Sequence, residues 1–300
     1  MMARNQVKQV TLFEGLSQSV TDFGLLVKFK LTLLVLFSAV MSYAIACGGN
    51  VNWATMWMLA FGGFMVTGAA NALNQVLERD YDRLMTRTAN RPVATGRLSV
   101  SKAVLWAGLM ATVGIAVLSL FNPLTGFLGT LSLISYAFVY TPLKRSTPLS
   151  VLVGAIPGAL PLIIGCAVHD GFISQTAFML FTLQFLWQFP HFWAVAWLAD
   201  EDYKKAGFYL LPSKNGEKDP TTGLLSFVFC ILMIGNAGMG YSLGLVGGVA
   251  TVVLILLNAY WAWCCWKLYK NCSREAARRQ MFVSFLHLPV SLIVLLIDKV

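Results

Sequence analysis

The residues best suited to chemistry lie in residues 71–92, a stretch that follows an apolar run long enough to span a bilayer. Asn74, Glu78 and Asp82 stand four positions apart, so on a helix they form one stripe that drifts only ~40° per step. Two carboxylates at this spacing repel each other, which costs an isolated helix roughly 0.2–0.5 kcal/mol unless a cation lies over them. Carboxylate and amide oxygens suit Mg²⁺, which proteins usually hold with one or two carboxylates plus substrate phosphates. The stripe therefore predicts a magnesium site in which these three residues are catalytic.

A stripe of arginines runs beside the first. Arg79, Arg83, Arg87 and Arg91 are again four positions apart and offset by one residue from the acidic stripe. Guanidinium groups bind phosphate oxygens, so metal-binding oxygens beside them indicate a diphosphate site. The alternative is a solvated, charged loop in which the spacing is incidental.

Polar side chains also follow the apolar run that ends at Leu198. Gln184, Gln188, His191 and Asp202 lie within ~40° of one helical face, and polar residues at membrane depth normally face the bundle interior or a wet cavity. Asp202 belongs to a second cluster of carboxylates and lysines, which we expect at the same depth as the first.

Two pairs of cations lie where other apolar runs meet the membrane interface. Lys144 and Arg145 follow one run, at the expected level of the acidic stripe, and Lys28 and Lys30 precede another. For the latter pair, snorkelling anchors and phosphate contact remain equally open.

The composition is that of a polytopic membrane protein. Of 300 residues, 57% are hydrophobic and only 12% charged, whereas soluble domains carry ~25% charged residues. The net charge of +9 could indicate nucleic acid, but the cations lie between apolar runs, where they orient the chain and meet anionic lipid, so we expect no nucleic-acid partner. Residues 1–24 are polar and do not resemble a cleavable signal peptide, and the six cysteines form no metal or haem-attachment motif.

Apolar runs of bilayer length predict about nine transmembrane helices in a single domain, residues 1–300. Tight turns are expected at Asn122–Pro123 and Leu245–Gly247. Of the 22 Lys and Arg residues, 21 fall on one side of this arrangement, so the N-terminal segment (residues 1–24) and the long loops are predicted to be cytoplasmic and the C-terminus extracytoplasmic. The runs lie near residues 31–48, 53–73, 103–121, 124–140, 150–168, 172–198, 222–244, 246–266 and 281–297.

Glycine and proline add detail to two of these helices. Gly154 and Gly158 permit close helix approach, while Pro157 and Pro161 are expected to break their helix where neighbours satisfy the freed carbonyls. Pro190 is expected to kink its helix beside His191. Of the other histidines, His287 has no evident polar companion and is interpreted as structural, and His169 as solvated.

Several blocks resemble the intramembrane UbiA-type prenyltransferase family and, within it, the branch that farnesylates haem. The stripe Asn74-xxx-Glu78-xxx-Asp82 is similar to the family's first acidic motif. More specific are RTANRPVATG (residues 87–96), YTPLKRSTPLS (140–150), VGAIPGALPLIIG (153–165) and QFPHFWAVAWLADEDYKKAGFYLLP (188–212). Ala206 stands where the wider family has a second aspartate of a DxxxD motif, a departure that this branch shares.

The resemblance implies a bundle of nine transmembrane helices around a central cavity capped by cytoplasmic loops, in a bacterial inner membrane. It implies transfer of farnesyl from farnesyl diphosphate to a vinyl group of haem b, with Mg²⁺ as cofactor. A haem A synthase or terminal oxidase is a candidate assembly partner, besides membrane lipid. The implied residues are Asn74, Glu78, Asp82 and Asp202 for metal, Arg83, Arg87, Arg91, Lys144, Arg145 and Lys204 for diphosphate, and Tyr140, Trp187, Gln188 and His191 for haem.

Three alternatives remain open from the sequence. His191 either ligates haem iron or is satisfied by Gln188 or by a carbonyl freed at Pro190. The acceptor could be a quinone precursor in place of haem. A transporter would also have polar residues and broken helices at membrane depth, although here the acids gather at one mouth.

Overall fold

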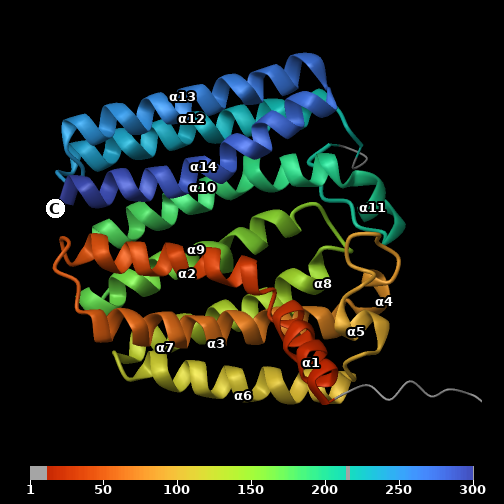
Figure 1. Cartoon of the computed structure of the whole chain (residues 1–300). Coiled ribbons are helices and arrows are strands. Elements are labelled where there is room, and N and C mark those ends of the chain that lie inside the picture. Colours follow the sequence, from red (N-terminus) through yellow and green to blue (C-terminus); the bar gives the residue numbers. More distant parts are fainter. Residues whose placement is uncertain (1–11, 214–216, 300) are drawn as a thin grey trace, which may run out of the picture.

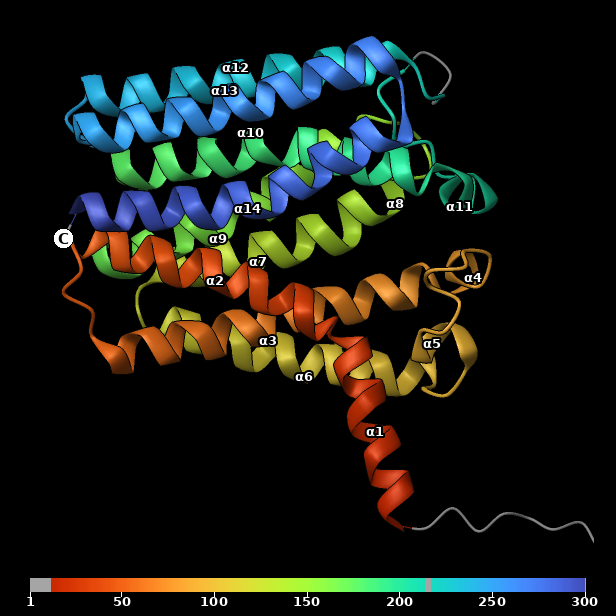
Figure 2. The same ribbon diagram turned by 45° about the horizontal axis from the view of Figure 1, so that its top comes forward.

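The computed structural model describes residues 12–213 and 217–299, and within these ranges the chain is helical, without strands. The long helices run side by side in one bundle (Figures 1 and 2). Part of the predicted N-terminal segment, residues 1–11, lies outside the described ranges. The elements are α1 Leu12–Leu26, α2 Phe29–Ala46, α3 Trp53–Leu77, α4 Arg79–Asp82, α5 Pro92–Thr95, α6 Val100–Ser119, α7 Pro123–Ile134, the π-turn η1 Ser135–Tyr140, α8 Thr141–Leu143, α9 Ser150–Asp170, α10 Gln175–Leu198, α11 Asp200–Lys205, α12 Pro220–Ser242, α13 Gly248–Asn271 and α14 Arg274–Lys299.

The described residues contain nine helical stretches of membrane-spanning length, taking Pro123–Leu143 as one, and each overlaps a predicted apolar run. Eight of them are long and apolar enough to cross a membrane. The ninth, α10, has 24 residues, but Gln184, Gln188 and His191 reduce its hydropathy. The chain is therefore an all-α integral membrane protein.

The short elements gather at one end of the bundle. Figure 1 shows α4, α5 and α11 together at that end, whereas the C-terminus of α14 lies at the opposite end. The two predicted tight turns are present, between α6 and α7 and between α12 and α13. Asn122 caps the first by accepting a hydrogen bond from the backbone N–H of Thr125 at 2.9 Å.

The two central prolines do not break α9, contrary to the prediction. The helix is continuous from Ser150 to Asp170 because neighbouring helices satisfy its carbonyls, as the sequence led us to expect. Ser132 Oγ lies 3.4 Å from the carbonyl of Pro157, which lacks a helical partner because Pro161 has no N–H, and Gln184 Nε2 also donates to the carbonyl of Gly158 at 2.6 Å. Helix α10 is continuous through Pro190, and the predicted kink at this residue stays a prediction.

Two irregularities separate the site from ideal helix geometry. Lys28, between α1 and α2, has φ 47° and ψ 56°, the left-handed conformation. The fourth span winds into the π-turn η1 before α8, a local widening that is frequent at functional sites. The ring of Tyr140 at the end of η1 packs where a side chain on Gly154 would clash, 2.6 Å from a Cβ placed there.

Candidate active site

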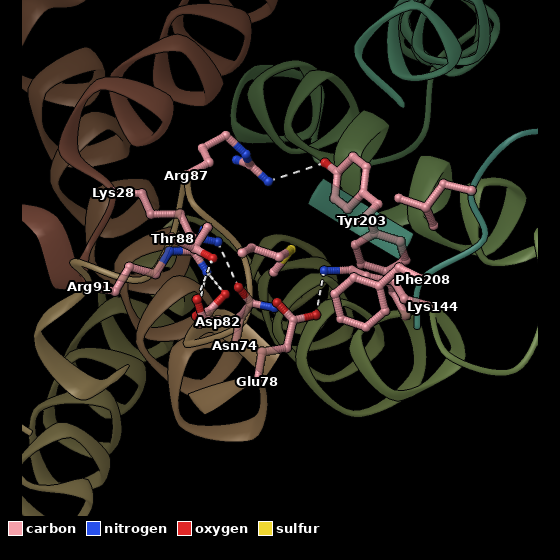
Figure 3. A pocket seen from close by; sticks show the side chains of 13 residues that line it. Lys28, Asn74, Glu78, Asp82, Arg87, Thr88, Arg91, Lys144, Tyr203 and Phe208 are labelled. Atoms are coloured by element: carbon pink, nitrogen blue, oxygen red, sulfur yellow. Dashed lines mark hydrogen bonds and ion pairs between the residues drawn. The ribbon is translucent and has the colours of Figure 1, made fainter. Parts of the chain in front are cut away.

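The residues of the predicted acidic stripe keep their helical spacing across a break in the helix. Helix α3 ends at Leu77, Glu78 caps it, and α4 begins at Arg79. The backbone N–H of Glu78 still donates to the carbonyl of Asn74 at 2.9 Å, and that of Asp82 to Glu78 at 2.8 Å. The spacing of four is thus kept, and Asn74, Glu78 and Asp82 line one pocket (Figure 3).

The pocket is a cavity of about 110 Å³ between the end of α3 and the loops that cap the bundle. That is smaller than the ~300–1,000 Å³ of pockets that enclose a whole drug-sized ligand, so it suits the polar end of a larger molecule. Its walls carry four cations and two carboxylates, a net positive charge. The lining residues are Lys28, Asn74, Glu78, Asp82, Met85, Arg87, Thr88, Arg91, Tyr140, Lys144, Tyr203, Phe208 and Leu210.

The orientation of the Asn74 amide follows from its neighbours. The hydroxyl of Thr141 donates to the carbonyl of Tyr136 at 2.9 Å, so its oxygen must accept from Asn74 Nδ2 at 3.1 Å. The carbonyl oxygen Oδ1 therefore faces the other way, where it accepts from Lys28 Nζ at 2.7 Å. An acceptor oxygen directed at a cation can equally well meet a metal ion.

Glu78 forms a buried ion pair with Lys144, at 2.7 Å. Burial alone would raise the pKa of the Glu78 carboxyl, but the charge and hydrogen bond of Lys144, with Lys28, outweigh it and lower this pKa. Burial likewise opposes the charge of Lys144, and Glu78 outweighs it, so the pKa of the ammonium is raised. Both groups are thus charged at neutral pH. Lys144 also lies over the ring of Tyr140, 4.6 Å from its centroid.

Asp82 has no solvent exposure and pairs with Arg91 through both oxygens, at 2.8 and 2.7 Å. Burial raises the pKa of this carboxyl despite the guanidinium of Arg91. A further positive charge near Asp82 would favour the carboxylate, as a divalent cation would provide.

The remaining two cations of the pocket are Arg87, in the loop after α4, and Lys28, between α1 and α2. Arg87 Nη2 donates to the hydroxyl of Tyr203 at 3.2 Å (Figure 3). Burial, with the charges of Arg91 and Lys144, holds the pKa of Lys28 well below its usual value. An anionic ligand would counter both effects. The structure therefore favours the phosphate-contact alternative for Lys28, whereas Lys30 is exposed and does not line the pocket.

Three predicted diphosphate-binding residues do not line this pocket. Arg83 donates to the carbonyl of Ala94 at 2.6 Å and pairs with Asp80. Arg145 packs over the ring of Tyr81 at 4.2 Å. Lys204 pairs with Asp200 at 3.1 Å.

Asp202, predicted as a further metal ligand, also lies outside the pocket lining. Its two oxygens accept from the backbone N–H groups of Thr86 and Arg87 at 2.8 and 3.0 Å, and Lys205 pairs with it at 3.3 Å. In this structure the carboxylate joins α11 to the arginine-bearing loop after α4.

Of the residues predicted to bind haem, only Tyr140 lines the pocket. Gln188 Nε2 donates to the carbonyl of Ala155 on α9 at 2.9 Å, whereas Trp187 Nε1 donates to that of Ser284 on α14 at 3.1 Å. His191 stacks on Trp187, with ring centroids 4.5 Å apart. Gln188 thus contacts α9, whereas His191 contacts α14. The sequence suggested Gln188 or a carbonyl freed at Pro190 as the partner of His191, and the structure shows neither.

The partner of His191 is Ser284. Ser284 Oγ donates to the carbonyl of Met281 at 2.5 Å, so it accepts from His191 Nδ1 at 2.7 Å. This assigns the proton to Nδ1 and leaves the lone pair on Nε2, the form that ligates metals. His287, interpreted as lacking a polar companion, does have one: its Nε2 lies 2.9 Å from Asn258 Oδ1. His169 is exposed, as expected.

The sequence reasoning did not single out several lining residues. Tyr203 and Phe208 come from α11 and the segment after it, and Met85 and Thr88 from the turn after α4. Tyr203 does stand next to Asp202 in the quoted block 188–212, which is the signal that could have found it.

The donor set fits Mg²⁺ only together with a ligand. In the described part of the chain, no group of three or more His, Cys, Asp or Glu side chains could hold a metal ion. The pocket offers two carboxylates and one amide oxygen, a hard oxygen set that leaves positions for phosphate oxygens.

The sequence matches a known protein family and a named relative over most of its length. Residues 35–287 match the model of the UbiA prenyltransferase family. The chain is 40% identical over 277 residues to the Protoheme IX farnesyltransferase of Cytophaga hutchinsonii, covering 92% of this chain and 96% of that one.

Solved structures share the fold at low sequence identity. A digeranylgeranylglyceryl phosphate synthase superposes with a TM-score of 0.78 at 14% identity, covering 94% of this chain and 99% of that one. A UbiA homologue from Archaeoglobus fulgidus bound to GPP and Mg²⁺ superposes with a TM-score of 0.66 at 16% identity, covering 91% and 99%.

Proposed function

The chain belongs to the UbiA prenyltransferase family, and from this premise we propose that it transfers the farnesyl group of farnesyl diphosphate to a vinyl group of haem b, giving haem O and diphosphate. The observation that carries this function is the 40% identity, across 92% of the chain, to a relative named Protoheme IX farnesyltransferase. Further relatives with 38–39% identity carry the same name, which favours haem over a quinone precursor and over a transported solute.

The pocket binds the diphosphate end of the donor. Lys28, Arg87 and Arg91 approach from one side and Lys144 from the other, so charge that develops on the leaving oxygens meets fixed cations. Three predicted diphosphate-binding residues lie outside the lining and would not contact the diphosphate directly: Arg83, Arg145 and Lys204.

Asn74 Oδ1, Glu78 and Asp82 would hold Mg²⁺ against the diphosphate. The ion bound in the Archaeoglobus fulgidus homologue supports this cofactor. When bound, Mg²⁺ supplies Lewis-acid stabilisation of the departing diphosphate. Lys144 and Arg91, which pair with the two carboxylates in this structure, would then be free to bind phosphate oxygens.

The proposed reaction breaks one carbon–oxygen bond and forms one carbon–carbon bond. The bond between farnesyl C1 and the diphosphate oxygen breaks, the electron pair leaves with diphosphate, and an allylic cation remains. The vinyl group of haem attacks C1, and water adds to the resulting carbocation and loses one proton to solvent, which leaves a hydroxyl. Tyr140 lines the pocket and packs against Gly154, and its ring, which lies 4.6 Å from Lys144 Nζ, would also stabilise the positive charge of the allylic cation.

Haem enters from the membrane and lies toward α10 and α14. Trp187 offers a flat apolar ring, and His191 Nε2 would ligate the iron, with Ser284 holding the Nδ1 proton as a second-layer partner does in metal-binding histidines. Gln188, bonded to α9, would act only by holding α10 against that helix.

We place the protein in the bacterial inner membrane, with the pocket open to the cytoplasm. The cation-rich loops lie at the pocket end of the bundle, which the positive-inside rule assigns to the cytoplasm.

The purified protein in detergent, supplied with haem b, farnesyl diphosphate and MgCl₂, tests the function. We expect haem O by chromatography and mass spectrometry, with diphosphate released in equal amount. Release of diphosphate with prenylation of a quinone precursor but not of haem would indicate another acceptor. No release with any acceptor would contradict a prenyltransferase.

A further inference from the structure

Lys28 lines the pocket and lies at the break between α1 and α2, where its backbone is left-handed. Its φ of 47° makes it one of two non-glycine residues with positive φ in the described chain, with Cys272. An L-residue rarely adopts this conformation, because its Cβ lies too close to the following carbonyl oxygen. Surrounding contacts must therefore fix it.

Those contacts come from α3. The last carbonyls of a helix lack N–H partners within the helix. At the end of α1, two buried side-chain amides of α3 donate hydrogen bonds to these carbonyls. Gln75 Nε2 donates to the carbonyls of Leu25 and Leu26 at 2.7 and 3.0 Å, and Gln75 has no solvent exposure. Asn71 Nδ2 donates to the carbonyl of Val27 at 3.2 Å.

A threonine of α2 completes this arrangement. Thr32 Oγ1 donates to the carbonyl of Val27 at 2.7 Å and accepts from Asn71 Nδ2 at 3.2 Å. These contacts hold residues 25–27, immediately before Lys28, against α3. We call the three residues that make them, Asn71, Gln75 and Thr32, the Lys28 clamp. The same helix carries Asn74, whose Oδ1 receives Lys28 Nζ at 2.7 Å.

We infer that Asn71 and Gln75 are positioning residues that hold the Lys28 ammonium in the diphosphate pocket. They do not line the pocket, and so act through Lys28. This inference rests on the proposed function insofar as the ligand is a prenyl diphosphate. Because α3 carries Asn71, Asn74 and Gln75 and is capped by Glu78, one helix positions both the Lys28 ammonium and the proposed metal-binding oxygens.

A double-mutant cycle tests the clamp. We expect Lys28→Ala to raise the KM for farnesyl diphosphate roughly tenfold, as loss of a hydrogen bond to a charged group does, and Asn71→Ala to raise it by a similar factor. If Asn71 acts through Lys28, the double variant should rise no further than Lys28→Ala alone. The KM for haem should stay unchanged in all three.

Asn122 provides the matched control for stability. Its Nδ2 also donates to a helix-end carbonyl, that of Ala167 at 2.8 Å, but at the opposite end of the bundle. Asn122→Ala should lower the melting temperature and leave the KM for farnesyl diphosphate unchanged. If Asn71→Ala behaves in the same way, or if its effect on KM multiplies with that of Lys28→Ala, the inference is wrong.

Two further measurements keep the test decisive. Should Asn71→Ala not fold, Thr32→Val removes part of the clamp and is expected to raise KM in the same direction; an unchanged KM in a folded Thr32→Val would count against the clamp. Calorimetry with Mg²⁺ and inorganic diphosphate separates this inference from the proposed function. A wild-type protein that binds no diphosphate contradicts the function, whereas normal binding by both Lys28→Ala and Asn71→Ala contradicts the clamp alone.

Discussion

At the scale of single residues, Asp82 and Asp80 stand two positions apart on α4 in opposite surroundings. The Asp82 carboxylate is buried on Arg91, whereas that of Asp80 is 66% exposed and pairs with Arg79 and Arg83. We expect Asp82→Asn to lower kcat by ~10²-fold or more, since it removes a proposed ligand of the Mg²⁺ that would stabilise charge on the departing diphosphate. Asp80→Asn should change kcat by less than about threefold, as expected for an exposed ion pair. Steady-state rates across a Mg²⁺ titration measure both, and equal losses would contradict the stripe.

A folding defect must be separated from a catalytic one in Asp82→Asn. Breaking a buried ion pair on one side destabilises a protein by roughly 3–5 kcal/mol, and Arg91 would be left without its partner. The double variant Asp82→Asn/Arg91→Gln removes both charges and should regain much of the melting temperature. If activity returned with it, Asp82 would be structural.

His191 yields a spectroscopic prediction. With the proton on Nδ1, ligation of haem through Nε2 should be lost in His191→Ala, together with the absorption signature of bound haem, while diphosphate binding persists. Ser284→Ala should shift this signature, because it removes the partner that orients the ring. His287→Gln is the control, since His287 is buried on Asn258 and is given no part in haem binding. An unchanged spectrum in His191→Ala would make the histidine structural.

Sequence spacing predicted the acidic residues of the pocket better than its cations. Asn74, Glu78 and Asp82 follow one helical direction, which the backbone hydrogen bonds preserve across the break at Glu78. The arginine stripe does not stay on one face, because the chain leaves the helix after Asp82. Arg87 and Arg91 therefore turn back into the pocket, while Arg83 is held by Ala94. Such a turn depends on tertiary contacts that periodicity does not contain.

At the scale of elements, Asp202 is predicted to connect α11 to the loop after α4. The backbone N–H of Arg87 and groups of Thr86 and Lys205 hold the pKa of Asp202 to about 2. Because this pKa lies below the ~3.9 of an unfolded aspartate, the stabilisation is complete above pH ~4 and is lost as the pH falls towards 2. In Asp202→Ala we expect hydrogen exchange at the amides of Thr86 and Arg87 to rise at least tenfold, by roughly the worth of a charged hydrogen bond.

Asp200→Ala is the control for this connection, since Asp200 pairs with Lys204 and Lys218 and not with the loop after α4. The Mg²⁺ dependence of the rate distinguishes the connector from the metal ligand that the sequence suggested. If Asp202→Ala raised the Mg²⁺ concentration for half-maximal activity as much as Asp82→Asn does, Asp202 would be a ligand after all.

Element positions were predictable where one physical effect dominates. Bilayer-length apolar runs located all nine long helices of the described chain, because burial in hydrocarbon outweighs local preferences. The prolines of α9 misled the prediction because Ser132 and Gln184 satisfy the carbonyls, a contact between distant residues. The π-turn at Ser135–Tyr140 and the left-handed Lys28 were not predicted, since both depend on packing against α9 and α3.

At the scale of the whole molecule, the distribution of cations and the number of spans together predict on which side of the membrane each terminus lies. Helix α2 begins at the pocket end, where α4, α5 and α11 lie, and α14 ends at the opposite end (Figure 1). An odd number of spans requires the termini to lie on opposite sides. If α10, with its polar residues, failed to cross, eight spans would place both termini on one side and the loop after α10 opposite the arginine-bearing loop. That would separate Tyr203 from Arg87, although the structure joins them at 3.2 Å.

Reporter tags should therefore be cytoplasmic at the N-terminus and after Asn215, which lies between the described ranges, and extracytoplasmic after Val300. Both termini on the same side would exclude nine spans.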